Sequence, residues 1–248
     1  MLKAEGLMVF YENMLALNNI ALQCAENQIV GVFGANSAGK STLMYTLSGI
    51  ILDVKEKERM RGGEQITVLG DISFAGENIA ALKPHLRARR GIVLCPERRR
   101  LFPESSVLEN LKIGSFMATR QQASETLEYV LEIFQPLKKL LRRPAGFLSG
   151  GEQQMAAIGR ALMAQPKLLL LDEPLLGLSP AYQQVVMESV KTIRETRKIS
   201  IIVTEQYARP VIPVVDYAYI MENGSSVMSG TGPELLDNPD VKAAYFGV

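Results

Sequence analysis

The sequence has no tryptophan, one histidine and two cysteines among its 248 residues, and its formal net charge is only +1. Cys24 and Cys95 lie far apart and form no C-x-x-C pair. This excludes a disulfide framework and predicts buried thiols in a reducing compartment. With so small a net charge, the sequence lacks the excess of positive charge that is typical of nucleic-acid-binding proteins, so we expect no nucleic-acid partner.

Long apolar runs are also missing. No uninterrupted apolar stretch is long enough to span a bilayer, and the first residues lack the pattern of a signal peptide. Any role at a membrane is therefore expected to come through a partner. The composition, 47% hydrophobic and 21% charged, is enough for one large domain or for a core with a subdomain.

The most informative stretch is residues 34–41, which has the spacing G-x-x-x-x-G-K-S. The apolar run before it predicts a short buried strand, and residues 42–47 predict the start of a helix. A phosphate-binding loop needs this context, because backbone N–H groups and the helix dipole bind phosphate oxygens. Lys40 would bring a charge to the phosphates, and the Ser41 hydroxyl would ligate Mg²⁺. The alternative, a glycine-containing turn with a surface lysine, is disfavoured by the full spacing.

Two acids follow a second predicted strand. Residues 168–171 are four consecutive leucines, typical of a strand covered on both faces, and Asp172 and Glu173 come directly after them. Ligands bind at this end of parallel strands. Asp172 is a candidate to hold Mg²⁺ through water, and Glu173 to take a proton from an attacking water. An ordinary acidic strand end is the alternative, which the phosphate loop disfavours.

A further helix start is predicted at Ser149, a good N-cap that Gly150 and Gly151 follow. Alone it is only a cap. In a chain that already has a phosphate loop, it is a candidate for a second anion-binding helix terminus.

The remaining pattern predicts alternating strands and helices. Strands are expected at 2–10, 17–24, 64–74 and 200–204, and residues 89–97 are expected to form another strand that ends in a loop. A hairpin is expected at 217–228, and helices at 183–197 and 233–246. Helical pieces between 107 and 140 predict a small helical subdomain set into the α/β core. The charges of segment 53–63 alternate in sign, so we interpret it as a solvent-exposed loop that can include a helical turn. Contact with a partner protein is the alternative.

Two features leave alternatives open. Tyr11, at the end of the first strand, can stack on an adenine ring or can be an ordinary edge aromatic. The arginines at 98–100 are too short a run for a nucleic-acid patch, so we expect a solvated or ion-paired loop.

In this order the motifs closely resemble those of an ABC-transporter ATP-binding subunit, over nearly the whole chain. They are the phosphate loop, LSGGEQQ at 148–154 and LLLLDEP at 168–174. Finer features resemble the second ATPase subunit of branched-chain amino acid importers, the LivF type. These are CPE at 95–97 with the arginine run, the extended signature LSGGEQQMAAIGRAL, LSP at 178–180, TEQ at 204–206 and the ending AAYFG at 243–247.

The resemblance implies an α/β P-loop NTPase fold: an ABC ATPase core with an antiparallel β subdomain and an inserted α-helical subdomain. The core would comprise 1–95 and 159–230, the helical subdomain with the Q-loop and signature 96–158, and a C-terminal tail 231–248. The implied cofactors are ATP and Mg²⁺. Glu173 would be the catalytic base, with Glu97 in the Q-loop and Gln206 at the switch position.

The same resemblance implies the site residues. Nucleotide would be bound by Tyr11, Gly34, Ala35, Asn36, Ser37, Ala38, Gly39, Lys40, Ser41, Thr42, Ser149, Gly150, Gly151 and Glu152, and the metal by Ser41, Glu97 and Asp172. Two such subunits, in a homodimer or a heterodimer with a second ABC ATPase, would hold each ATP between one phosphate loop and the other subunit's signature helix.

The implied function is ATP hydrolysis coupled to import of branched-chain amino acids or related small solutes. The partners would be integral membrane permeases and, indirectly, a solute-binding protein, with this chain peripheral on the cytoplasmic face of the inner membrane. Import of urea or amides is an alternative. A non-transport ABC ATPase acting on nucleic acid or ribosomes is another, but that class usually carries two cassettes or a long coiled coil. A non-hydrolysing regulatory cassette is disfavoured by intact Lys40, Asp172 and Glu173.

Several positions depart from the wider family pattern. Ser37 stands at a usual glycine, so we expect a backbone with φ > 0 there. Glu97 replaces glutamine, Ser179 replaces the usual aspartate, and Gln206 replaces the switch histidine. The only histidine, His85, is on the wrong stretch to substitute for it.

Overall fold

The computed structural model describes residues 1–237. Its central sheet has six strands in the order β10-β9-β3-β8-β7-β6. These are β3 (Ile29–Phe33), β6 (Ile92–Cys95), β7 (Leu168–Asp172), β8 (Ser200–Glu205), β9 (Tyr217–Glu222) and β10 (Ser225–Gly230). Only β10 is antiparallel to its neighbour, so the predicted hairpin lies at one edge of a parallel sheet.

A second, antiparallel sheet has the order β2-β1-β4-β5. It consists of β1 (Leu2–Tyr11), β2 (Met14–Cys24), β4 (Ile66–Phe74) and the short β5 (Glu77–Asn78). The strand predicted from residue 17 begins at Met14, because a tight turn with Glu12 at φ 53° pairs Met14 directly with Tyr11.

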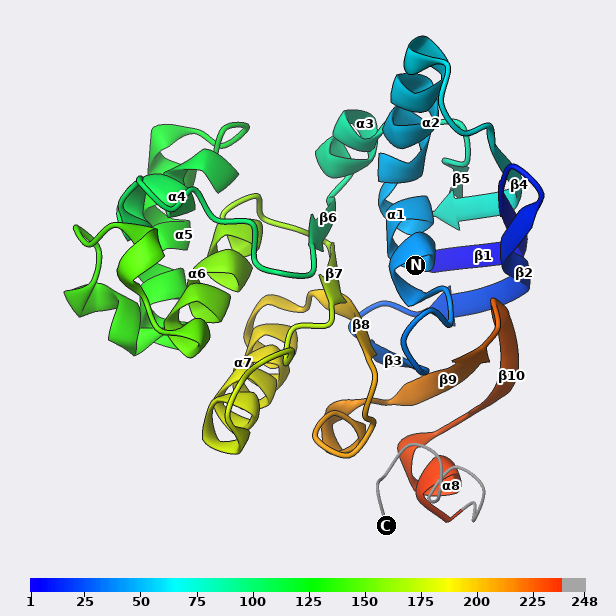
Figure 1. Ribbon diagram of the computed structural model, residues 1–248. Helices are drawn as coiled ribbons and strands as arrows, with labels where there is room; N and C mark the ends of the chain where they lie inside the picture. The colour runs from blue at the N-terminus through cyan, green and yellow to red at the C-terminus, as the bar shows by residue number, and fades with distance from the viewer. Residues whose placement is uncertain (238–248) are drawn as a thin grey trace.

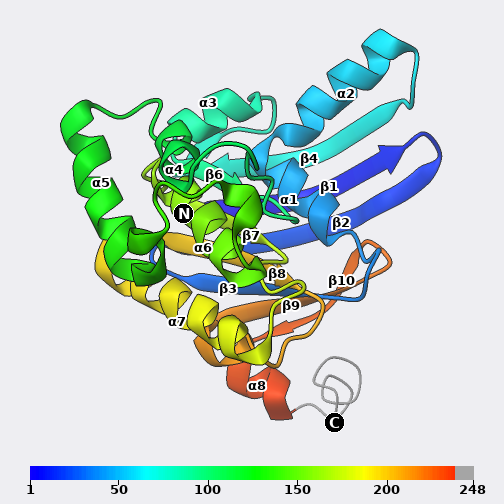
Figure 2. The ribbon, with the colours of Figure 1, turned by 60° about the vertical axis from the view of Figure 1, so that its left-hand side comes forward.

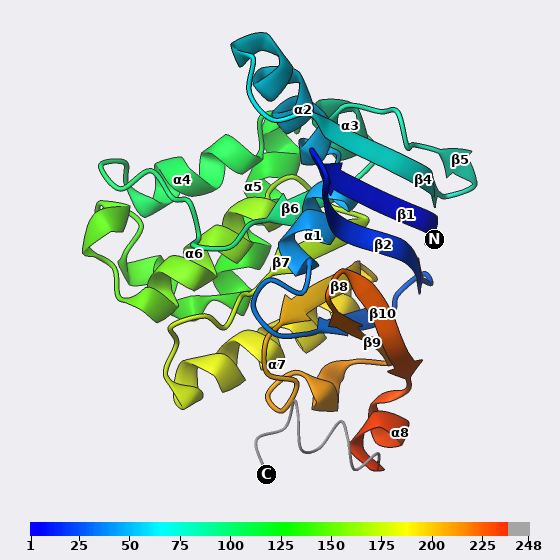
Figure 3. The same ribbon diagram turned by 45° about the vertical axis from the view of Figure 1, so that its right-hand side comes forward.

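One helix lies between the two sheets. The buried side chains of Leu43, Met44 and Leu47 on α1 (Lys40–Ser48) pack with residues of both sheets, such as Val32 and Leu17. Figure 3 shows α1 between the central strands and the β1–β2–β4 layer. The phosphate loop that starts α1 is therefore fixed to both sheets.

The opposite face of the central sheet is covered by α6 (Gly150–Leu162) and α7 (Pro180–Arg197). In Figures 1 and 2, α6 groups with α4 (Val107–Gly114) and α5 (Arg120–Ile133) in a helical lobe beside the core. Capping boxes start all three helices of this lobe, and the one on α6 confirms Ser149 as its N-cap. Short 3₁₀ helices at Gln135–Lys139 and Ala145–Phe147 connect α5 to α6. The predicted fold class is confirmed.

The segment 53–63 differs from the prediction. It is most of a regular helix, α2 (Ile50–Arg61), which projects beyond the sheets in Figure 1. Lysine, glutamate and arginine are good helix formers, and Gly49 and Gly62 mark the two ends with left-handed φ values of 83° and 65°. The predicted exposure was right, since Ile51 is the only buried residue of α2.

The remaining elements are α3 (Pro84–Arg89), a 3₁₀ turn at Ile212–Val214 and α8 (Gly232–Asp237). The last is the described beginning of the helix predicted at 233–246, and the rest of that prediction lies outside the described residues. Within residues 1–237, no helix has the length and apolar character needed to cross a membrane.

Candidate active site

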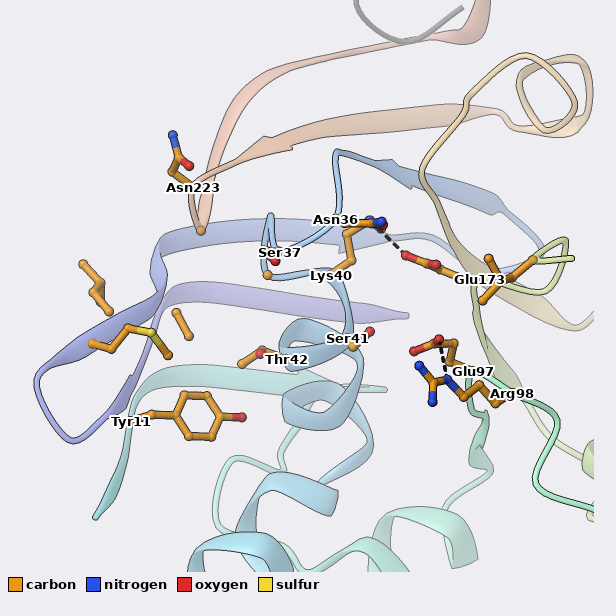
Figure 4. Close-up of a pocket in the computed structure, with 16 residues that line it drawn as sticks. Tyr11, Asn36, Ser37, Lys40, Ser41, Thr42, Glu97, Arg98, Glu173 and Asn223 are labelled. Atoms are coloured by element: carbon orange, nitrogen blue, oxygen red, sulfur yellow. Dashed lines mark hydrogen bonds and ion pairs between the residues drawn. The ribbon is translucent and has the colours of Figure 1, made fainter. Parts of the chain in front are cut away.

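A pocket of about 830 Å³ opens beside the N-terminus of α1 (Figure 4). Its walls are formed by Tyr11, Met14, Leu15, Ala16, Asn36, Ser37, Gly39, Lys40, Ser41, Thr42, Glu97, Arg98, Glu173, Leu176, Asn223 and Gly224. The pocket thus joins the phosphate loop to four segments that are distant in the sequence. Its size and polar lining suit a small charged ligand.

The phosphate loop is bent by two left-handed residues. Ser37 has φ 68° and Gly39 has φ 100°, so the expectation of a positive φ at Ser37 is confirmed. A Cβ atom at Gly39 would lie 2.7 Å from the carbonyl oxygen of Ala16, so no larger residue fits without a shift of the backbone. The loop must therefore approach β2 closely, and only glycine allows this.

Lys40 lies at the centre of the loop. Its side chain is only 3% exposed, and Nζ lies 3.0 Å from Glu173 Oε1 (Figure 4). The same ammonium donates to the carbonyl oxygens of Gly34 and Ala35 at 2.8 and 3.0 Å. Every ammonium proton thus has an acceptor, and a phosphate oxygen would compete with the Glu173 carboxylate for the Lys40 ammonium.

Asp172 is placed to bind a cation. Its side chain is buried, and Oδ1 accepts from Thr204 Oγ1 at 2.8 Å and from Ser41 Oγ at 3.3 Å. Oδ2 is buried without a hydrogen-bond partner within residues 1–237. Burial raises the pKa of Asp172, and a neighbouring cation would favour its charged form. This orphaned oxygen beside a hydroxyl fits Mg²⁺.

The fit depends on a ligand that supplies further oxygens. Across the described part of the chain, no group of three or more His, Cys, Asp or Glu is arranged to hold a metal ion. Mg²⁺ is usually bound by one or two carboxylates together with substrate phosphates, which is the arrangement that Ser41 and Asp172 offer.

Glu173 has a strained backbone with φ 45°. Its N–H lies 3.1 Å from both the carbonyl oxygen and Oγ1 of Thr204, so the end of β8 holds this conformation. Residues in such sparsely populated conformations cluster at functional sites. The carboxylate, 12% exposed, points into the pocket in Figure 4, as a general base requires.

Glu97 faces the pocket from the segment after β6 and pairs with Arg98 at 3.2 Å. This confirms the predicted ion-paired loop. Arg98, Arg99 and Arg100 all have left-handed φ values of 42–62°. Arg99 donates to the Leu176 carbonyl at 3.1 Å, and the Arg160 guanidinium donates to the carbonyls of Arg99 and Arg100. The strained run is therefore tied to the loop after Glu173 and to α6.

Tyr11 forms part of the pocket wall, with its hydroxyl beside the side chain of Thr42. Burial raises the pKa of Tyr11. Its ring lines the end of the pocket away from Glu173 in Figure 4. Stacking on adenine stays a prediction.

Some predicted residues are not brought to this pocket. Gln206 is half-buried next to Glu205 and is not part of the lining. Ser149 and Glu152 bind each other in the capping box of α6, where the Ser149 N–H donates to Glu152 Oε2 at 2.7 Å. Among the described residues, these signature residues do not line this chain's own pocket.

Sequence analysis missed part of the lining. Met14, Leu15 and Ala16 come from the start of β2, and Asn223 with Gly224 from the turn between β9 and β10. The turn itself was predicted, but the pairing of β9 with β3 brings it to the phosphate loop. The spacing of residues in the sequence does not predict which strands pair, so this contact could not be predicted.

Comparisons with known proteins agree with this geometry. The family described as "ABC transporter" matches residues 17–176. The chain is 39% identical to the high-affinity branched-chain amino acid transport ATP-binding protein BraG of Pseudomonas aeruginosa, over the full length of both chains. It is 29% identical to BraF of the same organism, over 99% of this chain and 97% of BraF.

A solved structure shares the fold. It is the ADP conformation of an ATP-binding cassette of an ABC transporter, with a TM-score of 0.83 and 26% identity, covering 100% of this chain and 99% of that one. The family match includes the phosphate loop, Asp172 at the end of β7 and Glu173 directly after it. The chain therefore belongs to the ABC transporter family, as an ATP-binding cassette that hydrolyses ATP.

Proposed function

We propose that this cassette drives an importer for branched-chain amino acids or related small solutes. The substrate class is supported by the 39% identity to BraG over the full length of both chains. Hydrolysis is supported by the buried ion pair between Lys40 and Glu173. Asp172, whose buried Oδ2 has no hydrogen-bond partner within residues 1–237, offers a carboxylate oxygen for a cation beside this pair.

ATP would bind with its phosphates in the loop and its adenine toward Tyr11. Lys40 would exchange Glu173 for phosphate oxygens, which releases the carboxylate to act as a base. Water would attack the γ-phosphorus and lose a proton to Glu173 as the bond to the bridging oxygen of the β-phosphate breaks. Mg²⁺, held by Ser41 and Asp172 with Glu97 nearby, would neutralise phosphate charge.

The signature helix would act on a second cassette. Ser149 is exposed and is not among the residues that line the pocket beside this chain's own phosphate loop. The N-terminus of α6, preorganised by its capping box, would meet the ATP held by the phosphate loop of the partner. Because this chain is closer to BraG than to BraF, we propose a BraF-like cassette as the partner in the cell, and a homodimer in isolation.

The importer would also contain membrane permeases and would draw on a solute-binding protein, with this chain peripheral on the cytoplasmic face of the inner membrane. The test is to co-express the chain with permeases encoded beside it, isolate the complex from membranes and measure uptake of labelled leucine. We expect ATP-dependent uptake with the wild-type chain and none with Lys40→Ala. Uptake of urea but not leucine would contradict the substrate class. ATPase activity stimulated by nucleic acid, without permease association, would favour the non-transport alternative.

A further inference from the structure

A buried acid at the back of the active site has no role in the mechanism above. Glu205, the last residue of β8, is only 6% exposed, and no ion pair to it occurs within residues 1–237. Its Oε1 accepts the backbone N–H of Leu175 at 2.7 Å. Leu175 lies two residues after Glu173, so this bond anchors the segment that carries the catalytic base.

Glu205 also binds the phosphate loop. Its carbonyl oxygen accepts the N–H of Gly34, the first residue of that loop, at 3.3 Å. One residue thus contacts the phosphate loop through its main chain and the Glu173 segment through its side chain. The preceding residue, Thr204, accepts the N–H of Glu173 itself. The end of β8 is therefore the common support of both halves of the catalytic site.

The supported segment needs such an anchor. Residues 173–178 belong to no strand or helix, and the backbone is left-handed at both Glu173 (φ 45°) and Gly177 (φ 69°). A non-glycine residue keeps such a conformation only where its surroundings enforce it. A buried carboxyl is unfavourable unless it is hydrogen-bonded, so the Leu175 bond also accounts for an acid at this position.

We propose that Glu205 is a positioning residue for ATP hydrolysis. Its carboxyl holds the Leu175 N–H and so fixes the Glu173 carboxylate relative to the phosphate loop. It contacts no reacting atom and acts through the main chain of residues 173–175. The inference rests on the proposed role of Glu173 as the base.

Three substitutions of Glu205 distinguish a side chain that positions the Glu173 segment from one that only fills space in the interior. Glu205→Gln keeps an oxygen at the same reach as Oε1 and can accept the same bond. Glu205→Met fills a similar volume without that acceptor. Glu205→Asp keeps the carboxyl but is one methylene shorter, so it cannot reach Leu175 without movement. Ile202→Val, a small change to a buried side chain of the same strand, is the control for a general loss of stability.

Purified variants are compared by the kcat and KM of ATP hydrolysis, by the Kd for Mg-ATP and by thermal unfolding. We expect Glu205→Gln and Ile202→Val to keep kcat within about twofold of wild type. Glu205→Met and Glu205→Asp should lower kcat about ten- to hundredfold, the scale of a misplaced catalytic group, while Kd changes less than about twofold.

Full kcat in the methionine or aspartate variant would overturn the proposal, and so would a loss of kcat in the glutamine variant. A parallel loss of kcat and Mg-ATP binding would also overturn it, since it would show a damaged phosphate loop. Glu173→Gln and Lys40→Ala in the same assay distinguish a failure of the Glu205 proposal from a failure of the proposed catalytic site. If the wild-type chain hydrolyses ATP and these two variants do not, the proposed catalytic roles of Glu173 and Lys40 stand whatever the result at Glu205.

Discussion

Replacing Glu173 by glutamine should change two properties of the site in opposite directions. Hydrolysis should fall at least ~10²-fold, because an amide cannot take the proton of the attacking water. Binding of Mg-ATP should become tighter, because Lys40 loses its ion pair with Glu173, 3.0 Å from Nζ, while both carbonyl contacts stay. Phosphate would then meet weaker competition for the ammonium.

The size of the second effect follows from the hydrogen bond that changes. A hydrogen bond to a charged group contributes about 1.5–3 kcal/mol. Lys40 stays charged, so its contact with a glutamine belongs to the lower end of this range and its contact with the carboxylate to the upper end. The contact should therefore weaken by up to about 1.5 kcal/mol, which corresponds to a Kd lower by at most roughly tenfold.

The assay combines calorimetric titration of Mg-ATP with phosphate release. Glu77→Gln is the matched control, because it also replaces a carboxylate that is part of an ion pair. Glu77 pairs with Arg90 at 2.6 Å on the surface and is not among the residues that line the pocket. This control should leave both quantities unchanged. Hydrolysis by Glu173→Gln within tenfold of wild type, or an unchanged or weaker affinity, would refute the reasoning.

Three further predictions concern other positions. Gln206→His should keep activity and add a pH-dependent step near pH 6.5, since an amide does not titrate there; identical pH–rate profiles would argue against contact of Gln206 with the γ-phosphate. Ser37→Gly removes left-handed strain of about 1–2 kcal/mol but costs about 0.5–1 kcal/mol in chain entropy, so the free energy of unfolding in urea should rise by up to about 1.5 kcal/mol; a fall would show that the serine side chain stabilises the loop. Burial raises the pKa of Glu205 from 4.5 to about 8, so between these values the folded chain keeps a proton that the unfolded chain loses, and stability falls as pH rises. Relative to wild type, Glu205→Gln should therefore gain stability from pH 5 to pH 8, by at most about 1.4 kcal/mol per pH unit. If the difference between the unfolding free energies of the two proteins did not change with pH, Glu205 would not be a neutral acid in the folded chain.

Local patterns predicted most of the elements. The phosphate loop, the leucine strand before Asp172 and the N-cap at Ser149 each depend on neighbouring residues, and the structure has all of them. The helix α2 was missed because alternating charges without an apolar face resemble a loop. Its stability comes from residue propensity and from the glycines at its ends.

The rest of the site depends on topology. Asn223 reaches the pocket only because β9 pairs with β3, and Arg99 reaches the Leu176 carbonyl only because β6 lies beside β7. Glu205 ends a strand whose other residues are buried, yet an acid at a strand end is normally exposed. Its burial follows from the loop that covers it, which strand periodicity does not encode.

The central claim is that the pocket around Lys40 binds ATP for hydrolysis. Calorimetric titration of Mg-ATP into the wild-type chain and Lys40→Ala tests it most directly, with Lys3→Ala as a control at a surface ion pair. The account predicts saturable binding to wild type and to Lys3→Ala, and almost none to Lys40→Ala. Undiminished affinity of Lys40→Ala would contradict it.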